Sequence, residues 1–305
     1  MSNIVDCLIV GGGPAGLTAS IYCKRSGLNV LVLEKESFGG QIATSPKVEN
    51  YPTIKSISGS ELIERMIDQV TELGVDIDID EVKHIERNDG IFHVIGEFST
   101  YLAKTVILAT GCVHRKLKAE GIDDFQDSGV SYCAVCDGSF YEGKDVCLVG
   151  DANTALQYSI LLSNICRKVY VCTLFDKFFG ERPLVDALLK KENVEVIHNV
   201  SLKTVNGNDK IESLDFENTK TKEIQNIKVD GLFVAIGQIP NNKDFENLVD
   251  LDEQGYFDSN ETCKTKTEGL YVAGDARRKD LRQVATAISD GAQAATLAVN
   301  YILNK

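Results

Sequence analysis

Residues 4–34, which read IVDCLIVGGGPAGLTASIYCKRSGLNVLVLE, decide the fold of this chain. The first seven residues are apolar and rich in β-branched side chains, and they predict a buried strand. A glycine turn follows, and then a helix that ends at Gly27. The segment LNVLVLE predicts a second strand that ends in an acid. Strand, glycine turn, helix and strand in this order predict a βαβ unit.

The same unit recurs at residues 145–173, where DVCLV, GDANTA, LQYSILLSNIC and KVYVCT predict strand, turn, helix and strand. The two copies align without a gap. The alignment places Gly11 on Gly150, Gly13 on Ala152, Gly16 on Ala155 and Glu34 on Thr173. Two nucleotide-binding units in one chain predict two doubly wound α/β domains.

Further apolar strands follow each copy, at residues 104–111 and 229–241. Another strand ends in GLYVAGDA, ahead of an alanine-rich helix at about 282–303. We therefore expect two Rossmann-like, three-layer nucleotide-binding domains. The first would be discontinuous, with residues 1–115 and 243–305, and the second would comprise residues 116–242.

The composition is that of a globular protein, with 43% hydrophobic and 25% charged residues. The net charge of −13 argues against nucleic acid or an anionic membrane as partner, because phosphates would be repelled. The apolar run near the N-terminus is short, is interrupted by Asp6 and follows no basic leader. We therefore expect neither a signal peptide nor a membrane span, and a cytoplasmic location.

The dinucleotide motif is complete in the first copy. Gly11 permits the tight turn, Gly13 lets the backbone approach a pyrophosphate, and Gly16 lets the helix pack closely on the strand. The positive end of the helix then faces the phosphates. Glu34 can accept hydrogen bonds from a ribose. The alternative, a glycine turn present only for packing, leaves the position of Glu34 unexplained.

One close cysteine pair, Cys133 and Cys136, stands just before the second copy. Zinc would need two more ligands, and no histidine or second cysteine pair stands at ligand spacing, so we expect no metal. Two thiols at this spacing can form a disulfide and exchange it through the thiolate. Asp137 follows directly, and a carboxylate there raises the pKa of a neighbouring thiol. Its expected role is proton delivery, and the alternatives are a helix N-cap or a solvated acid.

The chain resembles the low-molecular-weight, bacterial-type thioredoxin reductases over nearly its whole length. The motifs that carry the resemblance are GGGPAG at 11–16, GGQI at 39–42, VENYP at 48–52, ATG at 109–111, CAVCDG at 133–138, AIGQIPN at 235–241, VAGDA at 272–276 and LRQVATAISDG at 281–291.

This resemblance implies that the first domain binds FAD and the second carries the dithiol. It implies that Cys136 meets the flavin, that Cys133 attacks the disulfide of thioredoxin, and that Asp137 is the general acid or base. It also implies a homodimer. It further implies that the second domain rotates, so that the dithiol alternates between the flavin and the solvent. The implied FAD contacts are Gly11, Gly13, Gly16, Glu34, Gln41, Asn50, Asp275, Arg282 and Gln283.

The second copy departs from the family where NADPH should bind. Ala152 replaces the middle glycine, and Asp151 adds a negative charge beside it. The histidine and two arginines that grip the additional phosphate of NADPH are matched by residues 173–175, which read TLF, and a further arginine by Phe179. Each lost bidentate arginine contact removes about 1.5–3 kcal/mol.

In these departures the chain resembles the ferredoxin-dependent flavin thioredoxin reductases, which lack the basic NADPH motif. A flavin accepts single electrons, so we expect reduced ferredoxin as the electron donor. Ferredoxins are acidic and would need a local basic patch. The two candidates are His114, Arg115, Lys116 and Lys118, and the group Arg277, Arg278, Lys279 and Arg282.

Three alternatives remain open from the sequence. The first is an NADPH-dependent enzyme with an atypical site that binds through Lys177 or Arg182. The second is a flavin dithiol oxidase that passes electrons to oxygen. The third is a non-catalytic redox sensor that retains FAD.

Overall fold

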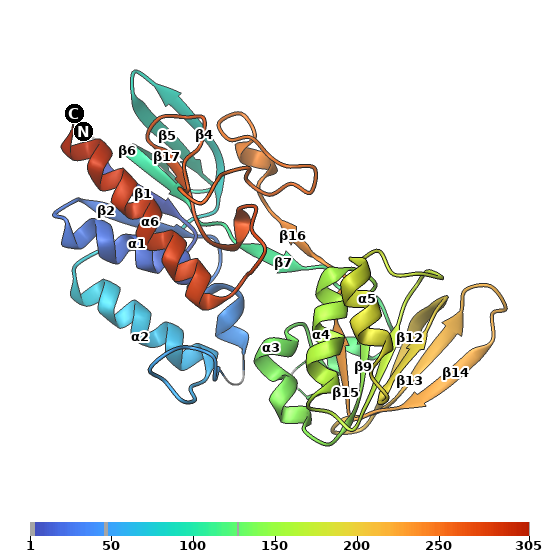
Figure 1. The fold of residues 1–305 in the computed structure, drawn as a ribbon. Coiled ribbons are helices and arrows are strands. Elements are labelled where there is room, and N and C mark those ends of the chain that lie inside the picture. Colours follow the sequence, from blue (N-terminus) through green and yellow to red (C-terminus); the bar gives the residue numbers. More distant parts are fainter. Residues whose placement is uncertain (1–3, 46–47, 127, 305) are drawn as a thin grey trace. The chain divides into compact units, whose positions relative to one another are not determined.

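The computed structural model describes residues 4–45, 48–126 and 128–304, and the chain divides into two compact units. Unit 1 comprises Met1–Val113 and Ile239–Lys305, and unit 2 comprises His114–Gln238. The connecting segments, β7 (Cys112–His114) and β16 (Gln238–Pro240), pair with each other (Figure 1).

The sheet of unit 1 is built around the first βαβ unit, with β1 (Ile4–Val10), α1 (Pro14–Arg25) and β2 (Val30–Glu34). Its strand order is β3-β2-β1-β6-β5-β4, and β17 also pairs with β6. The remaining strands are β3 (Asp76–Ile79), β4 (Val82–Asn88), β5 (Ile91–Gly96), β6 (Thr100–Leu108) and β17 (Leu270–Val272).

Two apolar layers enclose this sheet. One face packs against α1, α2 (Gly59–Glu72) and α6 (Val284–Leu303), and its core includes Leu17, Val32 and Ile107. The antiparallel hairpin β4–β5 continues the sheet from β6, and its side chains form a second core with the other face of the parallel strands and with the segment 245–257, a core that includes Phe92. The carboxyl ends of the parallel strands therefore lie between residues that pack on the two faces of the sheet.

Unit 2 repeats this arrangement around β9 (Asp145–Val149), α4 (Asn153–Ser163) and β10 (Lys168–Cys172). Its parallel sheet has the order β11-β10-β9-β15-β8, and an antiparallel sheet of β12-β13-β14 lies against it. The other elements are β8 (Val130–Ser131), α3 (Ala134–Asp137), α5 (Arg182–Leu189), β11 (Val194–Ile197), β12 (Val200–Gly207), β13 (Ile211–Asn218), β14 (Ile224–Lys228) and β15 (Gly231–Val234).

Short helical turns complete the two units. They are η1 (Gly40–Thr44), η2 (Ile122–Phe125), η3 (Gly138–Tyr141), η4 (Lys243–Phe245) and η5 (Gly274–Ala276).

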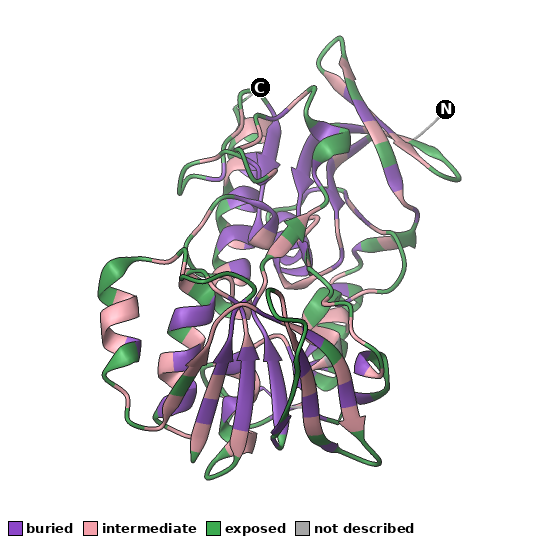
Figure 2. Cartoon of the chain, turned by 90° about the vertical axis from the view of Figure 1, so that its right-hand side faces the viewer, coloured by how far each residue is buried: buried purple, intermediate pink, exposed green. Residues whose placement is uncertain are grey.

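The predicted α/β class is confirmed, with a parallel sheet and a βαβ unit in each half of the chain. The third layer of each unit consists mainly of antiparallel strands rather than of further helices. Figure 2 shows the parallel strands buried along much of their length and the loops at their ends exposed. Among the described residues, no helix has the length and apolar character that a bilayer crossing requires.

A buried ion cluster fixes the end of β17 to α6. The Asp290 carboxylate accepts hydrogen bonds from Nε and Nη2 of Arg277 at 2.7 and 2.8 Å, and from the Gly274 N–H at 3.0 Å. The Nζ of Lys279 lies 2.6 Å from the same carboxylate. All three charged side chains are less than a tenth exposed, with fractions of 3%, 5% and 7% for Arg277, Lys279 and Asp290.

We predict that Asp290→Ala lowers the free energy of unfolding by about 3–5 kcal/mol, because it leaves two buried cations without their anion. The matched control is Asp258→Ala, which removes an exposed pair with Arg278 and should cost less than about 1 kcal/mol. Urea unfolding measures both, and equal effects would contradict the assignment of this cluster as a structural anchor.

Candidate functional site

A cavity of about 400 Å³ opens in unit 1 where β1, β2, β6 and β17 end. Ligands of parallel α/β sheets bind outside these carboxyl ends of the strands. Six of the predicted cofactor contacts line the cavity, namely Gly11, Gly13, Glu34, Gln41, Asp275 and Gln283. Gly16, Asn50 and Arg282 lie outside its lining.

The three glycines of the first turn meet different surroundings. Gly11 has a φ of 109°, and a Cβ there would lie 2.2 Å from the carbonyl oxygen of Ala109. A Cβ on Gly16 would lie 1.9 Å from the carbonyl oxygen of Gly11. A Cβ on Gly13 would meet nothing closer than 3.9 Å. The fold itself therefore requires Gly11 and Gly16, whereas the space beside Gly13 is open to a ligand.

Glu34 connects the end of β2 to this turn. Its Oε2 accepts a hydrogen bond from the Gly12 N–H at 2.7 Å, and its Oε1 accepts one from the Lys35 N–H at 2.8 Å. A carboxylate can accept about four hydrogen bonds. The carboxylate is thus held in place at the cavity wall and retains capacity for hydroxyl groups of a ligand.

Asp275 presents an unsatisfied acceptor at the cavity. Burial raises the pKa of its carboxyl to about 6, and the nearby cations Lys279 and Arg282 act in the opposite direction. Its Oδ1 is buried and has no hydrogen-bond partner among the described residues. Because a buried acceptor without a partner costs free energy, a ligand that donates hydroxyl hydrogens fits this position.

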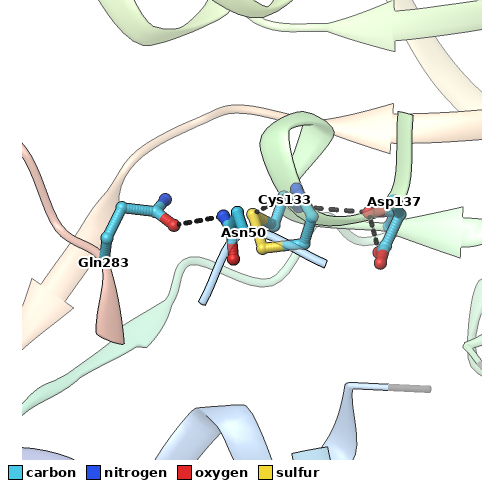
Figure 3. Close-up of a disulfide and its surroundings, with 6 residues drawn as sticks. Asn50, Cys133, Asp137 and Gln283 are labelled. Carbon is cyan, nitrogen blue, oxygen red and sulfur yellow. Dashed lines mark hydrogen bonds between the residues drawn. A yellow bond between two sulfur atoms is a disulfide. The ribbon is translucent and has the colours of Figure 1, made fainter. Parts of the chain in front are cut away.

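Three of the predicted contacts form hydrogen bonds to residues that line the cavity. The side-chain amide of Gln41 donates to the carbonyl oxygen of Cys112. Asn50 Nδ2 donates to Gln283 Oε1 at 3.0 Å, as Figure 3 shows. Arg282 Nε donates to the carbonyl oxygen of Asp275 at 3.1 Å, and its guanidinium lies 4.1 Å from the centre of the Tyr256 ring.

The dithiol of unit 2 is present as a disulfide between Cys133 and Cys136, at the start of α3 (Figure 3). Both residues are partly exposed, and Val135 between them is 44% exposed. The seven other cysteines are buried. Among the described residues, no group of three or more histidine, cysteine or acidic side chains is arranged to hold a metal ion.

Asp137 lies in surroundings that favour the protonated form of its carboxyl group. Burial raises the pKa of its carboxyl, and a hydrogen bond from Ser131 at 2.6 Å acts in the opposite direction. Its side chain caps no helix, because Cys133 is the N-cap of α3 and Asp137 makes no capping hydrogen bond to η3. Neither structural alternative, a helix cap or a solvated acid, describes this residue.

The second glycine turn is closed off by the chain itself. The Phe179 N–H donates to the carbonyl oxygen of Asp151 at 2.7 Å. Asn153, the first residue of α4, accepts a hydrogen bond from the Glu181 N–H at 2.7 Å and donates one to its carboxylate at 3.1 Å. The helix end that would face a pyrophosphate therefore borders the Glu181 carboxylate, and Asp151 lies two residues before the helix.

The end of β10 is apolar where a phosphate site would be basic. Thr173 is buried and donates to the carbonyl oxygen of Phe175 at 2.7 Å. Leu174, Phe175 and Phe179 are about half exposed, and the two phenylalanine rings pack edge to face. Two cations stand nearby. Lys177 lies over the Phe179 ring, and Arg182 donates to Asp186 at 2.9 Å.

One of the two candidate basic patches does not form a cationic surface. It is the group of residues 277–279 and 282. Arg277 and Lys279 are buried against Asp290, and Arg282 is engaged with Tyr256, which leaves only Arg278 exposed. In the other patch, burial lowers the pKa of His114 to about 4, so this side chain is neutral at physiological pH. Its exposed cations are Arg115, Lys116 and Lys118.

Sequence reasoning missed two polar residues. Asn242 is 1% exposed, accepts from Thr110 Oγ1 at 2.9 Å and donates to the carbonyl oxygen of Ala276 at 2.9 Å. It therefore joins two segments that border the cavity. Ser131 contacts Asp137, and its position two residues before Cys133, at the end of a strand, was the available signal.

Comparison with known proteins assigns the chain first to a class. The family described as Pyridine nucleotide-disulphide oxidoreductase matches residues 5–291. This class agrees with two nucleotide-binding units, one of which carries a disulfide.

Three relatives narrow the assignment. The thioredoxin reductase of Bacillus subtilis (strain 168) is 36% identical over 301 residues, which cover 98% of this chain and 95% of that protein. The structure of thioredoxin reductase from Streptococcus pyogenes MGAS5005 covers all of both chains at 34% identity and a TM-score of 0.94. A Ferredoxin-Flavin Thioredoxin Reductase from Clostridium acetobutylicum has 28% identity and a TM-score of 0.54, with 99% of each chain covered. The chain belongs to the low-molecular-weight thioredoxin reductase family.

FAD is the cofactor typical of this family, and the cavity of unit 1 fits it. The open space beside Gly13 suits a pyrophosphate at the N-terminal end of α1. The unsatisfied Oδ1 of Asp275 suits a hydroxyl of the flavin side chain.

We predict that Gly13→Ala weakens FAD binding at least about tenfold, or about 1.4 kcal/mol, because the added methyl takes the space of the pyrophosphate. It should leave the free energy of unfolding of the FAD-free protein unchanged, since its Cβ meets no protein atom closer than 3.9 Å. Gly16→Ala is the matched comparison and should destabilise the fold by about 1–3 kcal/mol. Flavin absorbance per protein and urea unfolding measure the two effects. Full FAD affinity in Gly13→Ala would contradict the assignment.

Proposed function

We propose that this chain is a flavin-dependent thioredoxin-disulfide reductase whose electron donor is reduced ferredoxin rather than NADPH. The observation that carries the choice of donor is the second glycine turn. There Ala152, Asp151 and Glu181 border the helix end that a nicotinamide dinucleotide would need.

Electrostatics at this turn oppose NADPH. Its phosphates would meet the Glu181 carboxylate at the N-terminus of α4 and a second acid, Asp151, in the turn before it, and residues 173–175 at the end of β10 include no arginine. Lys177 and Arg182 already have partners in Phe179 and Asp186. Two or three missing charge-assisted contacts, at about 1.5–3 kcal/mol each, weaken binding by several orders of magnitude.

In the proposed reaction the cofactor contacts are those named from the sequence: Gly11, Gly13, Gly16, Glu34, Gln41, Asn50, Asp275, Arg282 and Gln283. FAD would supply a redox group that collects single electrons and delivers a pair to a disulfide. Cys133 then attacks the disulfide of thioredoxin, and Cys136 resolves the mixed disulfide. Asp137 supplies and takes back the proton of this thiol pair.

The docking surface that we propose for ferredoxin is the cationic segment Arg115, Lys116 and Lys118. These side chains are exposed and form no ion pair among the described residues. Ferredoxins are acidic, so a local positive segment on a chain of net charge −13 would steer the encounter in a salt-dependent way. The similarity to the Clostridium acetobutylicum protein supports the choice of this donor.

The assembly is also part of the proposal. We expect a homodimer, and a rotation of unit 2 about β7 and β16 that moves the dithiol between flavin and substrate. Sedimentation velocity at several concentrations measures the first of these expectations.

The donor is tested by following flavin absorbance without oxygen while NADPH, NADH or reduced ferredoxin is added. We predict rapid bleaching by reduced ferredoxin alone, followed by reduction of thioredoxin.

Arg115→Glu combined with Lys118→Glu should slow ferredoxin-driven bleaching about tenfold or more at low salt, with little effect at high salt. The control is Lys220→Glu, an exposed cation of the same unit.

Rapid bleaching by NADPH would overturn the choice of donor and leave a conventional reductase. Release of hydrogen peroxide when a small dithiol is added, without reduction of thioredoxin, would identify a dithiol oxidase instead.

We predict that Cys133→Ser and Cys136→Ser each lower thioredoxin reduction at least about a thousandfold, because a single thiol cannot close and reopen the disulfide. Bleaching of the flavin by its donor should persist in both variants. Cys166→Ser, which removes a buried core thiol of the same unit, is the control and should retain activity. A comparable loss of thioredoxin reduction in all three variants would indicate a structural effect of replacing cysteine rather than a role of the dithiol.

A further inference from the structure

Ser131 occupies the last position of β8, directly before the dithiol segment. Its backbone lies in the parallel sheet of unit 2, opposite Phe233 of β15. The side chain is 6% exposed. The sheet therefore fixes the position of this hydroxyl independently of the partly exposed cysteines that follow it.

The hydroxyl makes two hydrogen bonds of opposite sense. It accepts from the Cys133 N–H at 3.1 Å and donates to Asp137 Oδ2 at 2.6 Å; Figure 3 shows these bonds between Cys133 and Asp137. A serine hydroxyl has a single hydrogen. The Cys133 N–H can only donate, and the structure assigns the serine hydrogen to Asp137 Oδ2.

This direction distinguishes the two oxygens of the carboxyl group. Oδ2 is occupied as an acceptor, so a proton on Asp137 resides on Oδ1. Oδ1 is buried and has no hydrogen-bond partner among the described residues. When Asp137 is protonated, its proton therefore lies on an oxygen that has no other hydrogen-bond partner among the described residues.

We propose that Ser131 is a positioning residue that orients Asp137, so that Oδ1 exchanges a proton with the Cys133–Cys136 dithiol. The inference rests on the proposed function of this pair in disulfide reduction. When the S–S bond breaks on accepting an electron pair, two thiolates form. Asp137 Oδ1 gives its proton to one of them and becomes a carboxylate. When the pair closes again on reducing a substrate disulfide, the carboxylate takes the proton back.

The surroundings of Asp137 favour this exchange. Burial raises the pKa of its carboxyl, and the Ser131 hydrogen bond limits the rise by stabilising the anion. The other titratable groups around it are Tyr141 of η3 and Tyr158 of α4. The pKa values of both tyrosines are raised, first by burial and then by the Asp137 charge, so they stay neutral while Asp137 titrates.

The test measures thiol reactivity of the fully reduced holoenzyme against pH, with a dipyridyl disulfide as the probe and without oxygen. This readout requires neither ferredoxin nor thioredoxin. The seven other cysteines are buried, so the probe reports Cys133 and Cys136. An Asp137 carboxylate suppresses a neighbouring thiolate, which gives the wild-type profile an inflection at the pKa of Asp137.

We expect Ser131→Ala to move this inflection upward by about one pH unit, since the anion loses one hydrogen bond. Ser131→Thr keeps a hydroxyl and should restore the wild-type position, and Asp137→Asn should abolish the inflection. The matched control is Ser159→Ala, which removes a buried hydroxyl whose hydrogen bond, among the described residues, goes to the carbonyl oxygen of Ala155 in α4. It should cause no shift.

An unchanged inflection in Ser131→Ala, or equal shifts in Ser131→Ala and Ser159→Ala, would overturn the proposal. A second result is that Ser131→Ala shows the predicted shift of the inflection while ferredoxin fails to reduce the flavin of the wild-type enzyme. This result would support the role of Ser131 and reject the proposed donor. The two failures are thus distinguishable.

Discussion

The close approach of α1 to the backbone around it is the constraint on which unit 1 depends. A Cβ on Gly16 would lie 1.9 Å from the Gly11 carbonyl oxygen, and one on Gly291 of α6 would lie 2.2 Å from the Ala15 carbonyl oxygen. A Cβ on Gly274 would lie 2.9 Å from the Ala15 Cβ. The helix therefore packs directly on the backbone of its own turn and on α6, and only the Ala15 methyl separates it from Gly274 after β17. This packing places the N-terminal end of α1 at the wall of the cavity, where it can face phosphates.

Unit 2 shows that folding and ligand binding depend on different glycines of the same motif. Gly150 is still required, because a Cβ there would lie 2.4 Å from the Ala235 carbonyl oxygen. Ala152 stands where the open space of Gly13 would be, and the fold accommodates it. Asp151 and Glu181 then bring negative charge to this helix end. The fold of unit 2 thus requires glycine at position 150 and tolerates alanine at position 152.

The dithiol depends on that sheet for its chemistry. A partly exposed pair of sulfurs is accessible to a protein substrate, whereas the acid that we propose as its proton source gains from burial, because burial favours the protonated form. Burial of Asp137 has this effect, and the Ser131 hydroxyl fixes its orientation. The dithiol site therefore combines an accessible sulfur pair with an acid whose orientation is set by a hydrogen bond from Ser131 of β8.

The sequence by itself determined the two βαβ units, the complete first motif, the dithiol and the defects of the second motif, because these features depend on residue type and spacing within short segments. Tertiary structure decided what long-range contacts control. Arg277 and Lys279, which form a charge run in the sequence, are buried against Asp290, fewer than fifteen residues away on α6. His114 is neutral because burial lowers its pKa. The antiparallel third layers, the closure of the second turn by residues 179–181 and the contact of Ser131 with Asp137 likewise appear only when the chain is folded. Burial and hydrogen-bond direction set the charge of a side chain, and neither is encoded in local sequence.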